Sequence, residues 1–224
     1  MYVMTIDQQG SRTAPDAVPG LLDALADIAT VRDFERTIGD EIQGVLDDAE
    51  QVTLAVRIMA MQAGWHIGIG IGPVGEPLPP STVEGRGEAF YAARRAVEAA
   101  KNAPAHLVVD TGSEDAGGDG GYLAEAALRL MVRTIETIRT QSRRYIAYRL
   151  DHPESTQTDI AEHFDVSQQA VSRVLSLGSV EIIAGGQALS SIQLSQADAQ
   201  AAGERSRGSR AAPHASQSGD AHVV

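Results

Sequence analysis

The chain has 224 residues and 43% of them are hydrophobic, so one large domain or two small ones can form and the chain is not disordered throughout. Cysteine is absent, which excludes disulfides and thiolate chemistry. The formal net charge of −12 by itself argues against a nucleic-acid partner, and no apolar run reaches the roughly 18 residues of a membrane span. The first residues lack the basic and apolar regions of a secretory signal, so we expect a cytoplasmic protein with no membrane partner.

The acidic residues are concentrated in the first half of the chain. Residues 1–110 hold 8 basic and 16 acidic side chains, whereas residues 122–175 hold seven of each. Phosphate contacts supply much of the affinity of DNA-binding proteins. The neutral segment therefore gives weak support for a DNA site in the second half.

Residues 1–110 show alternating strand and helix patterns. Two strand-like runs flank Gly39-Asp40, which predicts a tight hairpin. The order β-α-β-β-α-β-α-β contains the split βαβ or ferredoxin-like unit. The predicted elements are a strand at 2–6, a helix beginning at 15–16, strands at 31–38 and 41–46, a helix at 51–63, a strand at 65–71, a helix at 87–102 and a strand at 107–109.

One predicted strand, at residues 65–71, has a nearly bare face. Gly68 and Gly70 alternate with larger side chains, and a bare strand face allows a backbone or a ligand to approach closely. We expect Trp65, at the start of this strand, to lie in the core and His66 to lie at the surface.

The second half of the chain is predicted to be helical. Residues 111–121 are acidic, glycine-rich and poor in apolar side chains, which is typical of a linker. A long helical pattern follows from Tyr122 to about Leu150. Ser, Ala, Gly and Gln dominate at the end of the chain, which predicts a disordered tail at 194–224. The predicted fold is α+β, with a ferredoxin-type domain at 1–110, the linker at 111–121 and an all-α domain at 122–180.

The stretch from Thr156 to Leu175 fits two short helices that cross over a tight turn. Thr156 is suited to cap the first helix, and Asp159 to complete a capping box. Asp165 and Val166 would make the turn, and Ser167 would cap the second helix. This pattern is similar to the helix-turn-helix family over about 20 residues. The residues expected to face inward are Ile160, Ala161, Phe164, Val166, Ala170, Val171 and Val174.

The second helix of this motif leaves four polar side chains outside. Glutamine suits adenine, arginine suits guanine or phosphate, and serine suits either. Helix-turn-helix proteins place this helix in the major groove of double-stranded DNA, and palindromic operators imply a homodimer. A helical hairpin used only for dimerisation is the alternative. The expected DNA-binding residues are Ser167, Gln168, Gln169, Ser172 and Arg173. Upstream, Arg139, Arg143, Arg144 and Arg149 would either reach phosphates or form a solvated face.

Several segments in the first half of the chain resemble parts of the class III nucleotidyl cyclases. They follow one another in the same order as in that family, across about 100 residues. The GDE-x-Q motif at Gly39–Gln43 and the early Asp-x-x-Gly-Ser-Arg at Asp7–Arg12 are also similar to SatD-type bacterial proteins. The segments that resemble the cyclases are Ile6–Ser11, Phe34–Asp40, Gly68–Val74 and Gly87–Arg94.

Two carboxylates at the ends of adjacent strands are able to hold Mg²⁺ and phosphate oxygens together, and Asp7 and Asp40 are the candidates. The cyclase resemblance implies a nucleotide site with Gly39, Asp40 and Arg94. The family's asparagine, four residues before this arginine, is replaced by Phe90. Losing an amide donor aimed at developing charge costs about a hundred-fold or more in rate, which argues against catalysis. In a simpler interpretation Asp40 serves the turn and Asp7 ends a strand.

The function that the sequence favours is a DNA-binding transcriptional regulator rather than an enzyme. The N-terminal domain would sense a ligand or mediate assembly. The alternative is a metal-dependent nucleotide-binding protein or nucleotidyl cyclase that uses Asp7 and Asp40. A scaffold whose helix-turn-helix binds protein is a third hypothesis.

Overall fold

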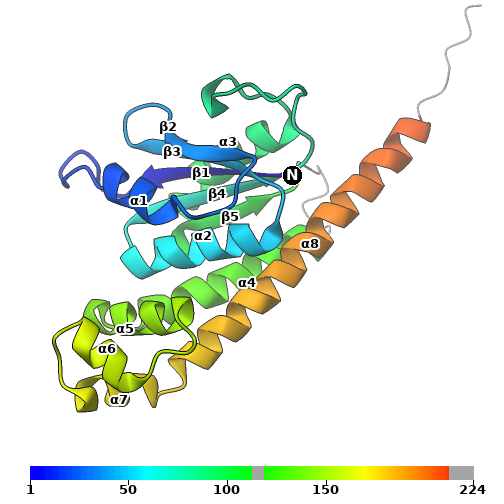
Figure 1. Cartoon of the computed structure of the whole chain (residues 1–224). Helices are drawn as coiled ribbons and strands as arrows, with labels where there is room; N and C mark the ends of the chain where they lie inside the picture. Colours follow the sequence, from blue (N-terminus) through cyan, green and yellow to red (C-terminus); the bar gives the residue numbers. More distant parts are fainter. Residues whose placement is uncertain (113–118, 212–224) are drawn as a thin grey trace, which may run out of the picture.

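The computed structural model describes residues 1–112 and 119–211 and shows an α+β fold with one mixed sheet (Figure 1). Within these residues, no helix combines the length and apolar character needed to cross a membrane. The elements are β1 (Tyr2–Gln8), α1 (Val18–Leu25), β2 (Arg32–Arg36), β3 (Glu41–Leu46), α2 (Ala49–Gln62), β4 (Trp65–Ile71), η1 (Thr82–Glu84), α3 (Glu88–Ala100), η2 (Pro104–His106), β5 (Leu107–Asp110), α4 (Asp119–Glu136), α5 (Thr140–Asp151), α6 (Gln157–His163), α7 (Gln168–Leu175) and α8 (Ser179–Ala211).

The five strands lie in the order β2-β3-β1-β4-β5, with β1 in the centre. All neighbouring pairs are antiparallel except β4 and β5, which are parallel. The order of strands and α-helices over residues 1–110 is the one that the sequence predicts. Gly39 has φ +61° in the turn between β2 and β3, a conformation that glycine adopts without steric cost.

The bare face of β4 lets the backbone of α3 approach closely. A Cβ atom on Gly70 would lie 2.1 Å from the carbonyl oxygen of Ala89, and one on Gly68 would lie 2.3 Å from the backbone nitrogen of Val97. These two positions therefore serve helix packing and do not open a ligand site. Trp65 is buried, as predicted.

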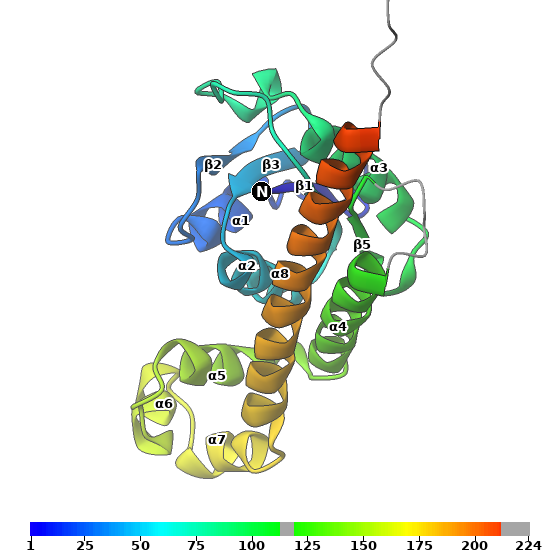
Figure 2. The same cartoon turned by 90° about the vertical axis from the view of Figure 1, so that its right-hand side faces the viewer.

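The two faces of the sheet are covered by different helices. Val3 of β1 packs with Ala89 and Ala93 of α3 on one face. Met4 and Ile6 belong to the larger core on the other face, where α2 and α4 lie side by side against the sheet and α8 crosses them (Figures 1 and 2). The side chains of β1 point alternately to the two faces of the sheet and so belong to two hydrophobic layers.

The main core continues into the second half of the chain. The buried residues Leu128 and Ile135 of α4, and Ile183 of α8, belong to the same cluster as the sheet. α4 begins at Asp119, inside the predicted linker at 111–121, and residues 113–118 lie outside the described part. The expected division into a sheet domain and a separate helical domain therefore does not follow the hydrophobic core.

The predicted disordered tail at 194–224 is wrong for residues 194–211, which continue α8. Leu194, Ala197 and Ala201 are buried, and this spacing of three and four residues places them on one helix face. The Tyr2 hydroxyl donates a hydrogen bond to the Leu194 carbonyl at 3.2 Å. Small residues, which suggested disorder in the composition, allow close packing here. Residues 212–224 lie outside the described part.

The long helix expected from Tyr122 to Leu150 is broken between α4 and α5. The side chain of Arg143 stabilises this break, because its guanidinium donates to the carbonyl of Glu136, the last residue of α4, at 3.1 Å and to that of Ile138 at 2.8 Å. The last carbonyls of a helix need such donors where no further helical turn supplies them. Arg143 is buried, so it caps a helix and does not face phosphates.

Helices α5, α6 and α7 form a small unit at the far end of α4 and α8 (Figures 1 and 2). Its own buried cluster consists of Tyr145, Ile160, Ala161 and Val171. Val174 and Leu175 touch both this cluster and the main core. The three helices are thus a satellite that is attached to the sheet region along one side.

Candidate nucleic-acid interface

The first helix of the pair, α6, begins with the capping box that the sequence predicts. The Thr156 hydroxyl accepts from the backbone N–H of Asp159 at 3.2 Å, and the Asp159 carboxylate accepts from the Thr156 N–H at 2.7 Å. Hydrogen bonds from the Thr156 backbone and side chain lower the pKa of Asp159. The start of α6 is therefore fixed by two reciprocal bonds.

The turn between α6 and α7 is tight and well defined. Asp165 has φ +50°, in the left-handed region that aspartate tolerates better than most residues. The Val166 N–H donates to the Ala161 carbonyl at 3.0 Å. Ala161 is buried and its small side chain leaves room for α7. The predicted roles of these residues agree with their positions.

The second helix, α7, presents the polar residues that the sequence selects for DNA contact. Its N-cap hydroxyl, on Ser167, accepts from the Ala170 N–H at 3.3 Å, and Val171 on the inner face is fully buried. Four of the five predicted residues are exposed and one is half-buried. The exposed ones are Ser167, Gln168, Gln169 and Arg173, and the half-buried one is Ser172.

The exposed side chains of α7 make few bonds within the chain. Gln168 donates to the Gln157 side-chain oxygen at 3.1 Å. Among residues 1–112 and 119–211, the side chains of Gln169 and Arg173 have no hydrogen-bond or ion-pair partner, so their donors face solvent. The backbone beneath them is held by the cap and by the buried cluster. This combination of fixed backbone and free polar tips suits recognition of an external surface.

The arginines upstream of α6 divide into different roles. Arg143 is the buried cap described above, and Arg149 donates to the carbonyl of Ser155 in the loop before α6. Arg144 is exposed and lies over the Phe164 ring at 4.9 Å, a cation–π contact. Arg139 is exposed at the start of α5. Only the last two remain as candidate phosphate contacts.

Asp7 and Asp40, the predicted metal ligands, do come together at the end of β1. Burial and a hydrogen bond with Asp40 raise the pKa of Asp7. Burial works against ionisation of Asp40 as well, but hydrogen bonds with Ser11 and Asp7 outweigh it and lower the pKa of Asp40. The two pKa values therefore move in opposite directions because the hydrogen-bond partners of the two carboxyls differ.

Two basic side chains lie beside this pair and its neighbour Glu41. The Lys101 ammonium lies 3.2 Å from Asp7, and Arg94 forms an ion pair with Glu41 on the neighbouring strand. Among the residues described, no three or more His, Cys, Asp or Glu side chains are grouped to hold a metal ion. Lys101 also pairs with Glu98, so these two basic side chains balance only part of the negative charge around the pair.

Sequence reasoning missed a second feature near this pair. The rings of His66 and His106 lie with their centroids 5.0 Å apart in an edge-to-face arrangement. Burial, followed by the charges of His106 and Lys101, lowers the pKa of His66. His66 is half-buried rather than a surface residue. The two histidines meet because β4 and β5 are parallel neighbours, which no local motif indicates.

Comparisons with protein-family models, with curated proteins and with solved structures give no match for this chain. Function must therefore be argued from the geometry itself. Of the two predicted sites, the carboxylate pair has a basic partner within the chain, and the α7 surface remains exposed to solvent.

Proposed function

We propose that this protein is a sequence-specific DNA-binding transcriptional regulator in which α7 enters the major groove. The observation that carries the proposal is the exposed row Gln168, Gln169 and Arg173 on a helix whose backbone is fixed by a cap, a tight turn and a buried inner face. Side chains at the start of such a helix are the ones that helix-turn-helix proteins direct at base edges. Ser172, half-buried on the same helix, would add one contact.

The surface around α7 has mixed charge, which shapes the expected mode of binding. Arg139 and Arg144 are exposed, and so are Asp159, Glu162 and Asp165 on and after α6. Phosphate contacts alone would give weak, salt-sensitive attachment. We therefore propose that contacts to the bases supply much of the affinity of this protein for DNA.

A homodimer on a palindromic operator is part of the proposal. α8 carries an exposed apolar stripe of Ile182, Leu189 and Ile192, whose spacing of seven and three residues is that of a coiled-coil seam. A second copy packed along this stripe would bury it. Two α7 helices related by a two-fold axis would then address half-sites about 34 Å apart.

The N-terminal part is proposed as a ferredoxin-like domain of SatD type that senses a ligand or mediates assembly. The order β2-β3-β1-β4 and the two crossing connections through α1 and α2 support this assignment. The alternative, a nucleotide-binding protein or cyclase, gains support from the meeting of Asp7 and Asp40. It loses support at Phe90, which is buried against Gly85 and leaves no room for a polar donor.

The experiment that tests the proposed function is genome-wide recovery of DNA fragments bound by the protein in its source cells. We expect the fragments to share a palindromic sequence that is not enriched with the doubly substituted variant Gln168→Ala, Gln169→Ala. Fragments without a common sequence, or equal enrichment by the variant, would contradict the proposal. Incubation of the purified protein with ATP or GTP and Mg²⁺ or Mn²⁺ tests the alternative, for which cyclic nucleotide formed by the wild type and lost in Asp40→Ala is the signature.

A further inference from the structure

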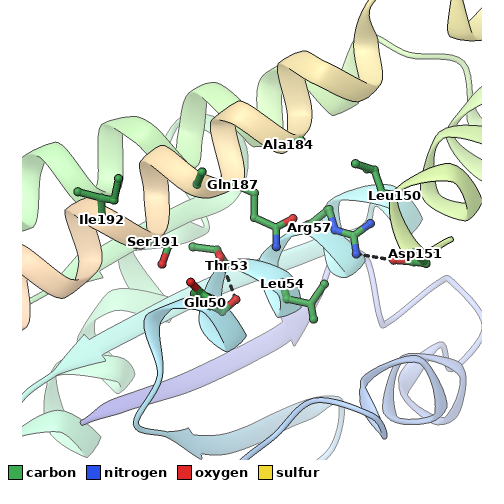
Figure 3. A pocket seen from close by; sticks show the side chains of 11 residues that line it. Glu50, Thr53, Leu54, Arg57, Leu150, Asp151, Ala184, Gln187, Ser191 and Ile192 are labelled. Carbon is green, nitrogen blue, oxygen red and sulfur yellow. Dashed lines mark hydrogen bonds and ion pairs between the residues drawn. The ribbon is translucent and has the colours of Figure 1, made fainter. Parts of the chain in front are cut away.

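A groove of about 620 Å³ lies where the sheet region meets the three-helix unit. It is bounded by α2, by α8 and by the last residues of α5 (Figure 3). This volume falls within the range of small-molecule sites. The groove therefore has the size and position to receive a ligand between the two regions.

A buried arginine occupies one end of the groove. Arg57 of α2 is 4% exposed, and its Nη2 lies 2.6 Å from a carboxylate oxygen of Asp151, the last residue of α5. The Nε–H of Arg57 is buried without a hydrogen-bond partner in the described part of the chain. A guanidinium offers five donors in a fixed fork, and leaving one of them unpaired in the interior is costly. The Asp151 side chain is half exposed and satisfies only part of this fork.

The other residues that line the groove differ in polarity and charge from one end to the other. Leu54 of α2 and Leu150 of α5 give it apolar walls beside Arg57, and Gln187 of α8 projects toward the same end (Figure 3). Glu50 lies at the other end of the groove, about two turns along α2 from Arg57. The groove thus has the Arg57–Asp151 pair and two leucines at one end, and at the other end a carboxylate that would repel a second anion.

We propose that this groove binds a small organic monocarboxylate, with its carboxylate on Arg57 and its apolar body against Leu54 and Leu150. Arginine and carboxylate form paired parallel hydrogen bonds, which would supply the acceptor that Nε lacks. The carboxylate of the bound molecule competes with Asp151 for the guanidinium. Asp151 is able to give way because half of its side chain already faces solvent.

Occupation of the groove changes the tie between α2 and α5. The Arg57–Asp151 pair joins the sheet region to the first helix of the three-helix unit, five residues before the Thr156 cap. Displacing Asp151 breaks this ion pair and changes the position of α7 relative to the sheet region. This consequence rests on the proposed DNA-binding function, and by linkage an operator would change carboxylate affinity by the same factor.

The groove is tested first without DNA, by titrating hexanoate into the full-length protein in a calorimeter. We expect saturable binding of one hexanoate, and no saturable binding of the neutral analogue hexanamide or of the dicarboxylate adipate. Arg57→Gln should weaken hexanoate binding by about tenfold or more, because a hydrogen bond to a charged group is lost. Arg95→Gln, at an exposed arginine of α3, is the matched control and should leave binding unchanged.

A second variant separates a binding role for Arg57 from a merely structural one. Asp151→Asn removes the competing carboxylate, so hexanoate should bind more tightly than it does to the wild type. No saturable binding of hexanoate, equal binding of hexanamide, or weaker binding to Asp151→Asn would each overturn the proposal. Operator affinity with and without hexanoate is then measured by fluorescence anisotropy. Failure of DNA binding leaves the calorimetric result standing, so the two proposals fail separately.

Discussion

Polar side chains gather in two regions of this molecule, at the edge of the sheet and on α7. The two regions differ in how far these side chains are paired within the chain. At the sheet edge, Asp7 is paired with Lys101, and Glu41 is paired with Arg94. On α7, Gln169 and Arg173 face solvent with no partner in the described residues. Side chains that are already paired have fewer free donors and acceptors to offer an external ligand. The difference favours α7 as the surface that meets a partner.

The cores beneath these two regions differ as well. The sheet, α2, α4 and α8 share one large cluster, whereas the separate cluster of the three-helix unit has only four buried residues. A small core that touches the large one along one side is expected to open more easily than the rest. The first two predictions test this difference.

Removing a central side chain of the small cluster should have the largest effect. Ile160 is fully buried in it, so Ile160→Ala should lower the free energy of unfolding of the three-helix unit by ~2–5 kcal/mol. Hydrogen exchange read by mass spectrometry should show faster exchange in α5–α7 and unchanged protection in β1 and β4. Equal loss of protection in the sheet would mean that the molecule opens as one unit.

In the sheet region, the closest backbone approach is the sensitive point. Gly70→Ala would place a methyl group 2.1 Å from the Ala89 carbonyl oxygen, so α3 must move away from β4. We expect a loss of ~3 kcal/mol in the free energy of unfolding, the upper part of the range for overpacking, measured by urea denaturation. Gly20→Ala in α1 is the control, because nothing lies within 4 Å of its added methyl group. A loss in both variants, or in neither, would count against the packing argument.

On α7, a single arginine should carry a measurable part of DNA affinity. Arg173→Ala should weaken operator binding by ~1–3 kcal/mol, roughly 5- to 150-fold in Kd, without changing the free energy of unfolding. A gel-shift titration on a recovered operator fragment measures this. Arg95→Ala on α3 removes an exposed arginine from the other region and should bind as the wild type does. Unchanged affinity of Arg173→Ala would remove the main support for the base-contact hypothesis.

The sequence predicts much of this arrangement because the decisive signals are local. The strand order along the chain, the Gly39 turn, the Thr156 capping box and the outward residues of α7 each follow from spacing within one or two elements. The α+β class follows from the same patterns. The bare face of β4 was correctly identified as a place of close approach, and α3 is what approaches it.

The parts that sequence reasoning missed depend on distant contacts. The helical course of residues 194–211 depends on packing of Leu194 and Ala197 against the main core, which composition does not reveal. The break after α4 is stabilised by Arg143, whose side chain could equally have been a phosphate contact on sequence grounds. Arg57 is an ordinary helix residue until Asp151, 94 positions later, is placed beside it. Long-range pairing of this kind leaves no periodic trace.

The smallest expected effect concerns the histidine pair near the carboxylates. Because burial, and then His106 and Lys101, lower the pKa of His66, the folded state favours its neutral form. The stability that results is present above the unfolded pKa of about 6.5 and is lost as the pH falls through the lower folded value. Urea denaturation between about pH 7.5 and pH 5.5 should therefore show a smaller loss of stability for His66→Asn than for the wild type. If the free energy of unfolding changed with pH in the same way for both proteins, protonation of His66 would carry no cost in the folded state. The contrast between a sheet edge with internal pairing and an exposed α7 would then lose one of its supports.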